Sequence, residues 1–382
     1  MFYSKQTRAK IAPIIAVFLA CLVLSGCMGP RGWPGVGSEG ETLFVGTMDG
    51  RVIAVNAGGG TLWTWEPPAE SGGSSIIACG GGGQFRAGML YGSPVVSDGV
   101  LYVSSYNGRV YAIDAEKRYD IWKYDTGSPI AGGVAVANST VFVGSSDGRL
   151  YALEANATMG KGSLKQGFEP FQTGDKIWST PAVQDGIVYF GSLDQKLYAL
   201  DSITGELIWE FPAAGAITST PLIVDGVVYI GAFDSKFYAL DAYTGDEKWV
   251  FEEADNWFWS KAVYANGTVY ACSLDQRVYA IDAESGNLAS GWVEPFDAGG
   301  DLKSAPVIVD NVLVVATEKG KLFGIDIKTG KSRWPDSIDL EVNVLSPLFA
   351  SGDTFYVNAQ DNRIYAFEGA TGRQNWSIPL SE

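Results

Sequence analysis

The chain has 382 residues, including 48 glycines and 12 tryptophans, and it contains no histidine. The absence of histidine excludes a Ser-His-Asp triad, His-ligated zinc and an imidazole general base. A formal net charge of −16 repels phosphate backbones, so we expect no nucleic acid partner. Glycine and aromatic residues at this abundance favour strands and tight turns over a helical bundle. Composition therefore favours a binding protein over an enzyme.

An export signal is predicted at residues 1–26. Three basic residues precede an apolar stretch over 11–26, which is shorter than the roughly 20 residues that a membrane-spanning helix needs. The stretch ends in the sequence LSGC, which resembles the lipobox of bacterial lipoproteins. This resemblance implies cleavage before Cys27 and lipidation of its thiol. The alternative is an ordinary signal peptide that is cleaved nearby, with no role for Cys27.

A lipidated Cys27 would anchor the mature chain in a membrane. We expect residues 27–31 to form a short tether and residues 32–382 to form the folded domain, which would lie close to the membrane surface. The expected location is extracytoplasmic, at the outer membrane or at the outer face of the cell membrane in a single-membrane organism.

One motif follows the signal in eight copies. The clearest read VYFGSLDQKLYALDSITGELIWEF from Val188 and VYIGAFDSKFYALDAYTGDEKWVF from Val228. Each copy carries an acidic or amide residue at one position, with a mean spacing of about 45 residues: Asn56, Asp114, Glu154, Asp201, Asp241, Asp282, Asp326 and Glu368. This period is the length of one four-stranded blade. The sequence therefore predicts an all-β, eight-bladed β-propeller of four-stranded antiparallel blades.

Each copy predicts four strands in the order A, B, C, D. Strand A follows small residues and proline, as at 179–183, and begins near Trp33 in the first copy. Strands B and C are nearly continuous apolar runs, because stacked blades bury both faces of each sheet. The last copy has its own strand D at 375–380, so we expect the eighth blade to pack on the first without strand exchange.

The turn between strands C and D carries two further repeated residues. Glycine stands four residues after the acid, where the turn needs a positive φ, at Gly205, Gly245, Gly286, Gly330 and Gly372. Tryptophan stands eight residues after the acid and would pack between blades, at Trp122, Trp209, Trp249, Trp334 and Trp376. The residue is displaced by two at Trp292 and by one at Trp63 or Trp65, and the third copy has an insertion and no tryptophan there.

The pattern A-x-D-x-x-T-G-x-x-x-W resembles the tryptophan-docking repeat of quinoprotein propellers over about residues 32–380. In that family, alcohol dehydrogenases hold pyrroloquinoline quinone with calcium in the central funnel, against a disulfide of adjacent cysteines. This sequence has no Cys-Cys pair, and we expect Cys272 to be a buried packing thiol. We therefore expect no catalytic residue, metal or cofactor. A quinoprotein-type enzyme with quinone and calcium, or a sugar-binding propeller, is the alternative.

Two sets of residues are candidates for an interaction face. A basic residue follows every B–C turn, and those considered for the face are Arg109, Arg149, Lys196 and Lys236. They either pair with local acids or form a basic rim that faces a partner. The D–A loops on the same face carry aromatic residues outside the docking position, namely Trp178, Trp257, Phe258 and Trp259. These either anchor a protein interface or fill the funnel and pack between inner strands.

The combined interpretation is a membrane-anchored scaffold that binds proteins of the cell envelope. Anchor, length and eight blades resemble, in architecture, the propeller lipoprotein of the outer-membrane β-barrel assembly machinery. That resemblance implies an envelope or membrane protein as partner and a role in outer-membrane protein assembly. No docking motif of that family can be matched residue by residue.

Overall fold

The computed structural model describes residues 32–68, 88–157 and 159–380, which belong to one compact unit. Among these residues the secondary structure consists of 33 strands arranged in eight sheets, with no helix. Accordingly, no helix in the described ranges could span a membrane. The predicted signal, Cys27 and the tether all lie outside the described residues.

The first four blades contain strands β1 to β17. Blade 1 comprises β1 (Val36–Glu39), β2 (Thr42–Gly46), β3 (Val52–Asn56) and β4 (Thr61–Trp65). Blade 2 comprises β5 (Val95–Ser97), β6 (Val100–Ser104), β7 (Arg109–Asp114) and β8 (Asp120–Asp125). Blade 3 comprises β9 (Val134–Ala137), β10 (Thr140–Gly144), β11 (Arg149–Glu154) and β13 (Phe171–Gln172). Blade 4 comprises β14 (Ala182–Gln184), β15 (Ile187–Gly191), β16 (Lys196–Asp201) and β17 (Leu207–Pro212).

The other four blades contain strands β18 to β33. Blade 5 comprises β18 (Leu222–Val224), β19 (Val227–Gly231), β20 (Phe237–Asp241) and β21 (Glu247–Phe251). Blade 6 comprises β22 (Val263–Ala265), β23 (Thr268–Cys272), β24 (Arg277–Asp282) and β25 (Phe296–Asp297). Blade 7 comprises β26 (Val307–Val309), β27 (Val312–Ala316), β28 (Lys321–Asp326) and β29 (Ile338–Asp339). Blade 8 comprises β30 (Phe349–Ser351), β31 (Thr354–Ala359), β32 (Arg363–Glu368) and β33 (Gln374–Pro379).

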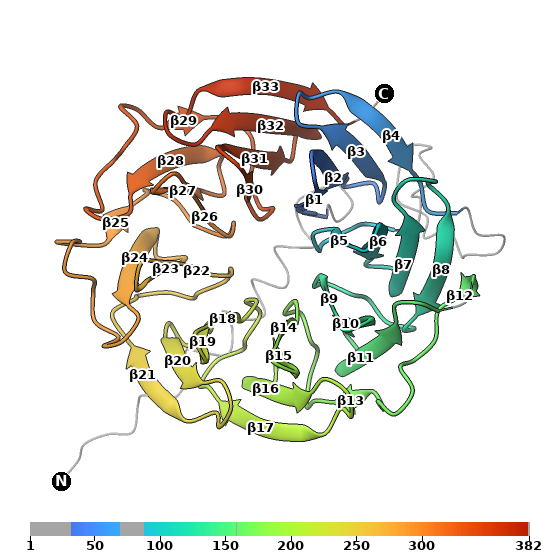
Figure 1. Ribbon diagram of the computed structural model, residues 1–382. Helices are drawn as coiled ribbons and strands as arrows, with labels where there is room; N and C mark the ends of the chain where they lie inside the picture. Colours follow the sequence, from blue (N-terminus) through green and yellow to red (C-terminus); the bar gives the residue numbers. More distant parts are fainter. Residues whose placement is uncertain (1–31, 69–87, 158, 381–382) are drawn as a thin grey trace, which may run out of the picture. The chain divides into compact units, whose positions relative to one another are not determined.

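The blades form a ring with their first strands at the centre and their last strands at the rim (Figure 1). Neighbouring A strands contact one another, as β1 does with both β5 and β30. The insertion of the third copy leaves its blade: β12 (Gly160–Lys161) pairs in parallel with β8 of blade 2. These findings confirm the eight-bladed propeller, with the first A strand starting at Val36 and not near Trp33.

The core lies between the blades, because strands B and C are buried on both faces. Every residue of β15 is buried, and so are the central four of β16. One apolar cluster joins Tyr189 and Leu197 of blade 4 to Val228 and Leu240 of blade 5. Each sheet is therefore stabilised mainly by its neighbours in the ring.

Tryptophan docking connects six pairs of neighbouring blades. In each pair an indole Nε1–H donates to the carbonyl oxygen of the residue after the acid of the next blade, at 2.9–3.0 Å: Trp122 to Ala155, Trp209 to Ala242, Trp249 to Ala283, Trp292 to Ile327, Trp334 to Gly369 and Trp376 to Ala57. The displaced Trp292 thus docks like the others.

The repeated glycine serves the docking as well as the turn. Gly286 has a φ of +73°, and a Cβ at this residue would lie 2.7 Å from the ring of Trp249 in the preceding blade. The indole therefore rests on glycine because any larger residue would occupy the same space.

The ring closes by side-chain contacts without strand exchange. The Asn358 amide Nδ2 donates to the carbonyl oxygens of Pro34 at 2.8 Å and Gly46 at 2.9 Å. The Arg51 guanidinium donates to the Leu380 carbonyl oxygen at 3.1 Å. The expected closure of blade 8 on blade 1 is confirmed.

Cys272 is a free thiol that is 2% exposed in β23, as expected. Burial raises the pKa of this thiol well above its ordinary value, so it remains protonated and packs as a small apolar group.

Candidate functional site: the axial funnel and the loop face

A cavity of about 420 Å³ lies where all eight blades meet, just before the A strands. We call the surface around it, formed by the D–A loops and B–C turns, the loop face. The two kinds of segment contact each other there, as where the Gly174 amide donates to the Asp194 carboxylate at 2.7 Å. The cavity is the funnel that the sequence predicts at the centre of the ring.

One repeated position contributes a side chain from every blade to the cavity, and we call it the first ring. Its members are Trp33, Tyr91, Ala131, Trp178, Thr218, Trp259, Lys303 and Leu345. The position two residues further along forms a second ring, in which Ser93, Gly133, Thr180, Thr220, Lys261, Ala305 and Pro347 line the cavity. Within each ring, neighbouring members come from consecutive copies of the repeat.

Four of the eight residues of the first ring are aromatic. The rings of Trp33 and Tyr91 meet edge to face, with centroids 4.7 Å apart. Trp178 is 36% exposed and lines the funnel together with Trp259. The funnel is therefore an open cavity with aromatic walls, which is the composition typical of ligand pockets.

The four aromatic residues singled out in the sequence occupy three different environments. Trp178 and Trp259 line the funnel, whereas Trp257 is 39% exposed beside it. Phe258 is only 1% exposed and packs on Phe237 in the core between blades. Phe258 therefore holds the loop against the core and is not accessible to a partner.

Phe233, a residue that the sequence analysis did not select, organises the loop before β22. Its ring stacks on Trp257 with centroids 4.4 Å apart and on Trp259 with centroids 5.4 Å apart. Phe233 lies in the B–C turn of blade 5, where the neighbouring copies have Leu193 and Leu274. The large apolar residue that recurs in these turns could have indicated, from the sequence, that this position packs against the neighbouring loop.

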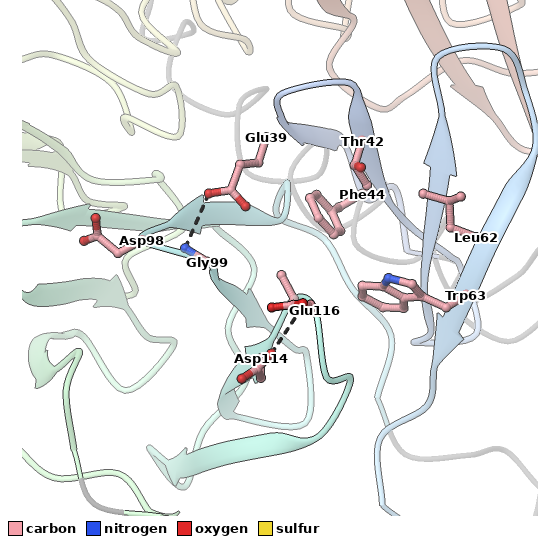
Figure 2. A pocket seen from close by; sticks show the side chains of 10 residues that line it. Glu39, Thr42, Phe44, Leu62, Trp63, Asp98, Gly99, Asp114 and Glu116 are labelled. Atoms are coloured by element: carbon pink, nitrogen blue, oxygen red, sulfur yellow. Dashed lines mark hydrogen bonds between the residues drawn. The ribbon is translucent and has the colours of Figure 1, made fainter.

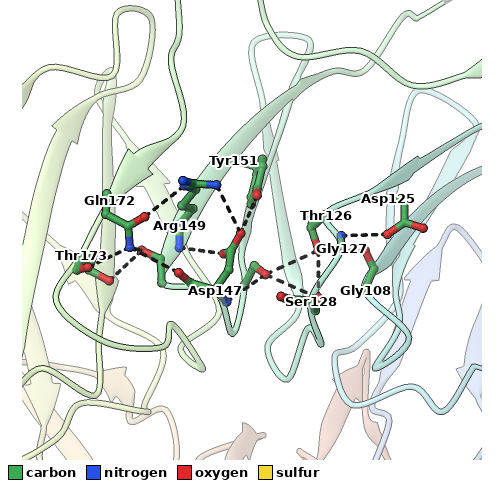
Figure 3. A network of polar contacts seen from close by, with 12 residues as sticks. Gly108, Asp125, Thr126, Gly127, Ser128, Asp147, Arg149, Tyr151, Gln172 and Thr173 are labelled. Atoms are coloured by element: carbon green, nitrogen blue, oxygen red, sulfur yellow. Dashed lines mark hydrogen bonds and ion pairs between the residues drawn. The ribbon is translucent and has the colours of Figure 1, made fainter.

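The four basic residues of the loop face contact groups in their own blades. Arg109 pairs with Asp125 at 3.2 Å and Lys196 with Glu210 at 2.6 Å, and Lys236 pairs with Glu252. Arg149 donates to the Gln172 side chain at 3.0 Å and lies 4.0 Å from Asp147 (Figure 3). The interpretation as local pairs therefore describes these residues, and such solvent-exposed pairs contribute little to stability.

The aspartates of the B–C turns serve as structural acceptors. In five blades a tyrosine hydroxyl donates to the carboxylate four residues before it, at 2.5–2.7 Å, from Tyr151, Tyr198, Tyr238, Tyr279 and Tyr365. Burial and this contact raise the pKa of Tyr151 and Tyr365 to about 12. These carboxylates therefore have a structural role in the turns.

The funnel does not fit a quinone held by calcium. Calcium takes six to eight oxygen ligands, with carboxylates prominent among them. No aspartate or glutamate is among the described residues that line the funnel. Nor do the described ranges contain a group of three or more His, Cys, Asp or Glu residues that could hold a metal ion.

A second cavity, of about 480 Å³, lies between blades 1 and 2 (Figure 2). Trp63 lies opposite Ala54 in the sheet, as the docked tryptophans lie opposite the equivalent alanine in their blades. Within the described residues, however, its indole makes no hydrogen bond to the Ala115 carbonyl oxygen, although both residues line the cavity. Arg118 takes the place of the docking glycine, with a φ of +67°. Because Arg118 carries a side chain where the docked interfaces have glycine, the indole of Trp63 has no flat surface to pack on, and a cavity remains.

Comparisons with known proteins agree with this architecture. A family model described as outer membrane protein assembly factor BamB matches five overlapping stretches, at residues 27–129, 49–161, 160–289, 252–345 and 275–382. No protein with a curated description matches the sequence.

Solved structures are similar in fold at low sequence identity. BamB from Moraxella catarrhalis has a TM-score of 0.67 and 17% identity, covering 88% of this chain and 91% of that chain. The computationally designed Ika8 protein has a TM-score of 0.70 and 15% identity, covering 89% and 100%. Quinohemoprotein alcohol dehydrogenase ADHIIG from Pseudomonas putida HK5 has a TM-score of 0.61 and 17% identity, covering 75% and 66%. At these identities the likeness shows the fold alone.

Proposed function

The chain belongs to the family of the outer membrane protein assembly factor BamB, and from this premise we propose that it is an envelope scaffold in outer-membrane protein assembly. The family is described by an assembly role and not by a reaction. We assign no catalytic residue, because the turn carboxylates are engaged in the fold and the chain has no histidine.

The observation that carries this proposal is the aromatic surface on the loop face. Trp178 and Trp257 are more than one third exposed although tryptophan is usually buried. Aromatic side chains that are partly exposed beside a cavity are typical anchors for a protein partner. The local basic residues would form the polar rim around them.

Site-specific photo-crosslinking in the source cell tests the surface. A crosslinker at Trp178 or Trp257 should link to an envelope protein. The control is Tyr243, an aromatic residue that is 53% exposed in a C–D turn, on the opposite face from the D–A loops. Equal crosslinking at all three residues, or none at the two tryptophans, would contradict the proposal.

A second experiment tests the assembly role with the Trp178→Ala, Trp257→Ala double variant. This variant should lower the amount of β-barrel protein in the outer membrane while the propeller itself accumulates normally. Unchanged β-barrel levels would count against an assembly role even if the crosslinks were found.

We further propose that Cys27 carries the lipid anchor. The Cys27→Ser variant, expressed behind an ordinary cleavable signal peptide, should move from the membrane fraction to the soluble extracytoplasmic fraction, because serine has no thiol to carry the lipid. A variant that stays with the membrane would show that protein contacts, and not the lipid, hold the chain there.

A further inference from the structure

Lys261 departs from the repeat at the centre of the funnel. The equivalent positions in the other blades hold small residues or proline, at Gly35, Ser93, Gly133, Thr180, Thr220, Ala305 and Pro347. Nothing in the blade geometry calls for a long cation here, since seven copies fold without one. The lysine is therefore a candidate for a role other than folding.

Lys261 has no counter-ion within the described part of the chain. It forms no ion pair or hydrogen bond there, and no carboxylate lines the funnel. The other lysine of the funnel, Lys303, is paired with Glu318 at 2.8 Å. Lys261 is an exposed residue of the funnel wall, so a molecule that enters the funnel can reach it, and desolvation by the surrounding protein lowers the pKa of its ammonium group. An unpaired cation in such a site is stabilised by any anion that enters.

Thr218, the first-ring residue of the neighbouring blade 5, supplies a second unused polar group on the funnel wall. Among the described residues, the Thr218 Oγ1 is the single buried side-chain polar atom without a hydrogen-bond partner. The hydroxyls of Ser179 and Ser219, which occupy the next position of the repeat in blades 4 and 5, donate to carbonyl oxygens at 2.8 Å. A buried hydroxyl without a partner carries a desolvation cost that a ligand oxygen would remove.

Aromatic side chains form much of the remaining wall, which also carries the hydroxyls of Ser93, Thr180 and Thr220. Trp259 lies two residues before Lys261, and Trp33, Tyr91 and Trp178 complete the aromatic part of the first ring. The cavity of about 420 Å³ is within the range of small-molecule sites and can hold one or two amino-acid residues.

We propose that the axial funnel binds a carboxylate joined to an aromatic or apolar body. The Lys261 ammonium and the Thr218 hydroxyl donate hydrogen bonds to the carboxylate, and the tryptophan rings contact the body. The carboxylate can belong to a free small acid or to the C-terminus of a peptide. This site goes beyond the envelope role and does not depend on it.

Titration calorimetry with matched probes tests the site in the purified folded chain. The probes are N-acetylphenylalanine, its amide, inorganic phosphate, and an acetylated tripeptide that ends in phenylalanine with a free carboxylate. The free acid should bind at least about tenfold more tightly than the amide, because a charge-assisted hydrogen bond is lost with the carboxylate. Tighter binding of the tripeptide than of N-acetylphenylalanine assigns the carboxylate to a peptide C-terminus, and the reverse order assigns it to a free acid.

Two variants assign the contacts. Lys261→Ala, which restores the small residue of the other copies, should weaken binding of the acid by about tenfold or more. Thr218→Val should weaken it by a few-fold. Lys117→Ala is the control, because Lys117 is an exposed lysine in a C–D turn and should leave the affinity unchanged.

Several outcomes would overturn the proposal. These are equal binding of acid and amide, phosphate binding as tightly as the aromatic acid, no binding by the native chain, or unchanged affinity in Lys261→Ala. Because that variant places a residue type already found in the second ring, it should fold normally, and a melting curve checks this directly.

Discussion

The interface between blades 5 and 6 and the interface between blades 1 and 2 are built from the same repeat but differ in their docking. At the first, Trp249 donates to the Ala283 carbonyl and its ring rests on Gly286. At the second, Trp63 has the equivalent register, but Arg118 replaces the glycine and the indole is not docked. The tryptophan alone is therefore insufficient for docking, because the residue that receives it belongs to the next blade.

The irregular interface also lacks the second donor of the regular one. The Tyr229 hydroxyl donates to the same Ala283 carbonyl at 3.4 Å, whereas Phe44 takes the place of that tyrosine in blade 1. Trp65, two residues beyond Trp63, is buried instead and donates to the Asp120 carboxylate at 2.7 Å. A different tryptophan thus secures blade 1 to blade 2, and the docking position is left as a cavity.

The largest expected effect is the loss of a docked tryptophan. Trp249→Ala should lower the free energy of unfolding by about 3–5 kcal/mol, because a buried aromatic ring and its hydrogen bond are removed. Trp63→Ala should cost about 1 kcal/mol, since its ring is only half-buried and makes no such bond. Urea unfolding of both variants measures the difference, and equal losses would show that docking does not distinguish the two interfaces.

The glycine under the indole should have the next largest effect. Gly286→Ala should destabilise the chain by about 2 kcal/mol or more, because both the positive φ and the indole oppose a Cβ. Gly267→Ala in the same blade is the matched control: its φ is +78°, but no atom lies within 4 Å of the added Cβ. It should cost about 1 kcal/mol from backbone strain alone. Equal losses of stability in Gly286→Ala and Gly267→Ala would mean that the Trp249 ring shifts to make room for the methyl group.

Arg118→Gly tests the irregular interface from the other side. The variant should raise the free energy of unfolding by about 0.5–1 kcal/mol, because glycine adopts the positive φ without strain. If the indole then docks, the gain should be larger in the native background than in Trp63→Ala. A double-mutant cycle from urea unfolding gives this coupling, and no coupling would mean that Trp63 stays undocked.

The smallest effect concerns the acid of the docking turn in blade 6. Hydrogen bonds from the Ser285 hydroxyl and backbone lower the pKa of Asp282 below its ordinary 3.8. The ionised carboxylate therefore adds stability that is present above the unfolded pKa and is lost as pH falls through the folded pKa. The stability difference between the native chain and Asp282→Asn should shrink below about pH 4. A difference that is constant from pH 7 to pH 3 would contradict this assignment.

Much of the fold could be predicted from the sequence because the propeller is a local pattern repeated. The acid, the glycine and the tryptophan lie within one C–D hairpin, and Trp122 or Trp376 could be assigned from spacing alone. Phe258 could have been assigned to the core in the same way, because it is equivalent to the buried Ile177 and Ile217 of the preceding blades.

The funnel was harder to predict because it belongs to no single copy. Trp178 and Trp259 were found as aromatics outside the docking position, but Trp33 and Tyr91 were missed. A comparison of the residues before each A strand would have shown Lys261 among small residues. It would not have shown whether an acid from another blade neutralises it.

The sequence by itself determined the number of blades, the order of strands within them and the absence of histidine chemistry. These follow from residues that lie close together in the chain, where turn geometry and strand burial act directly. Only the tertiary structure decided that Trp292 docks whereas Trp63 does not, which aromatic residues line the funnel and which lysine there has no partner among the described residues. Those properties depend on side chains from different blades, and closure of the ring is what brings them within contact distance.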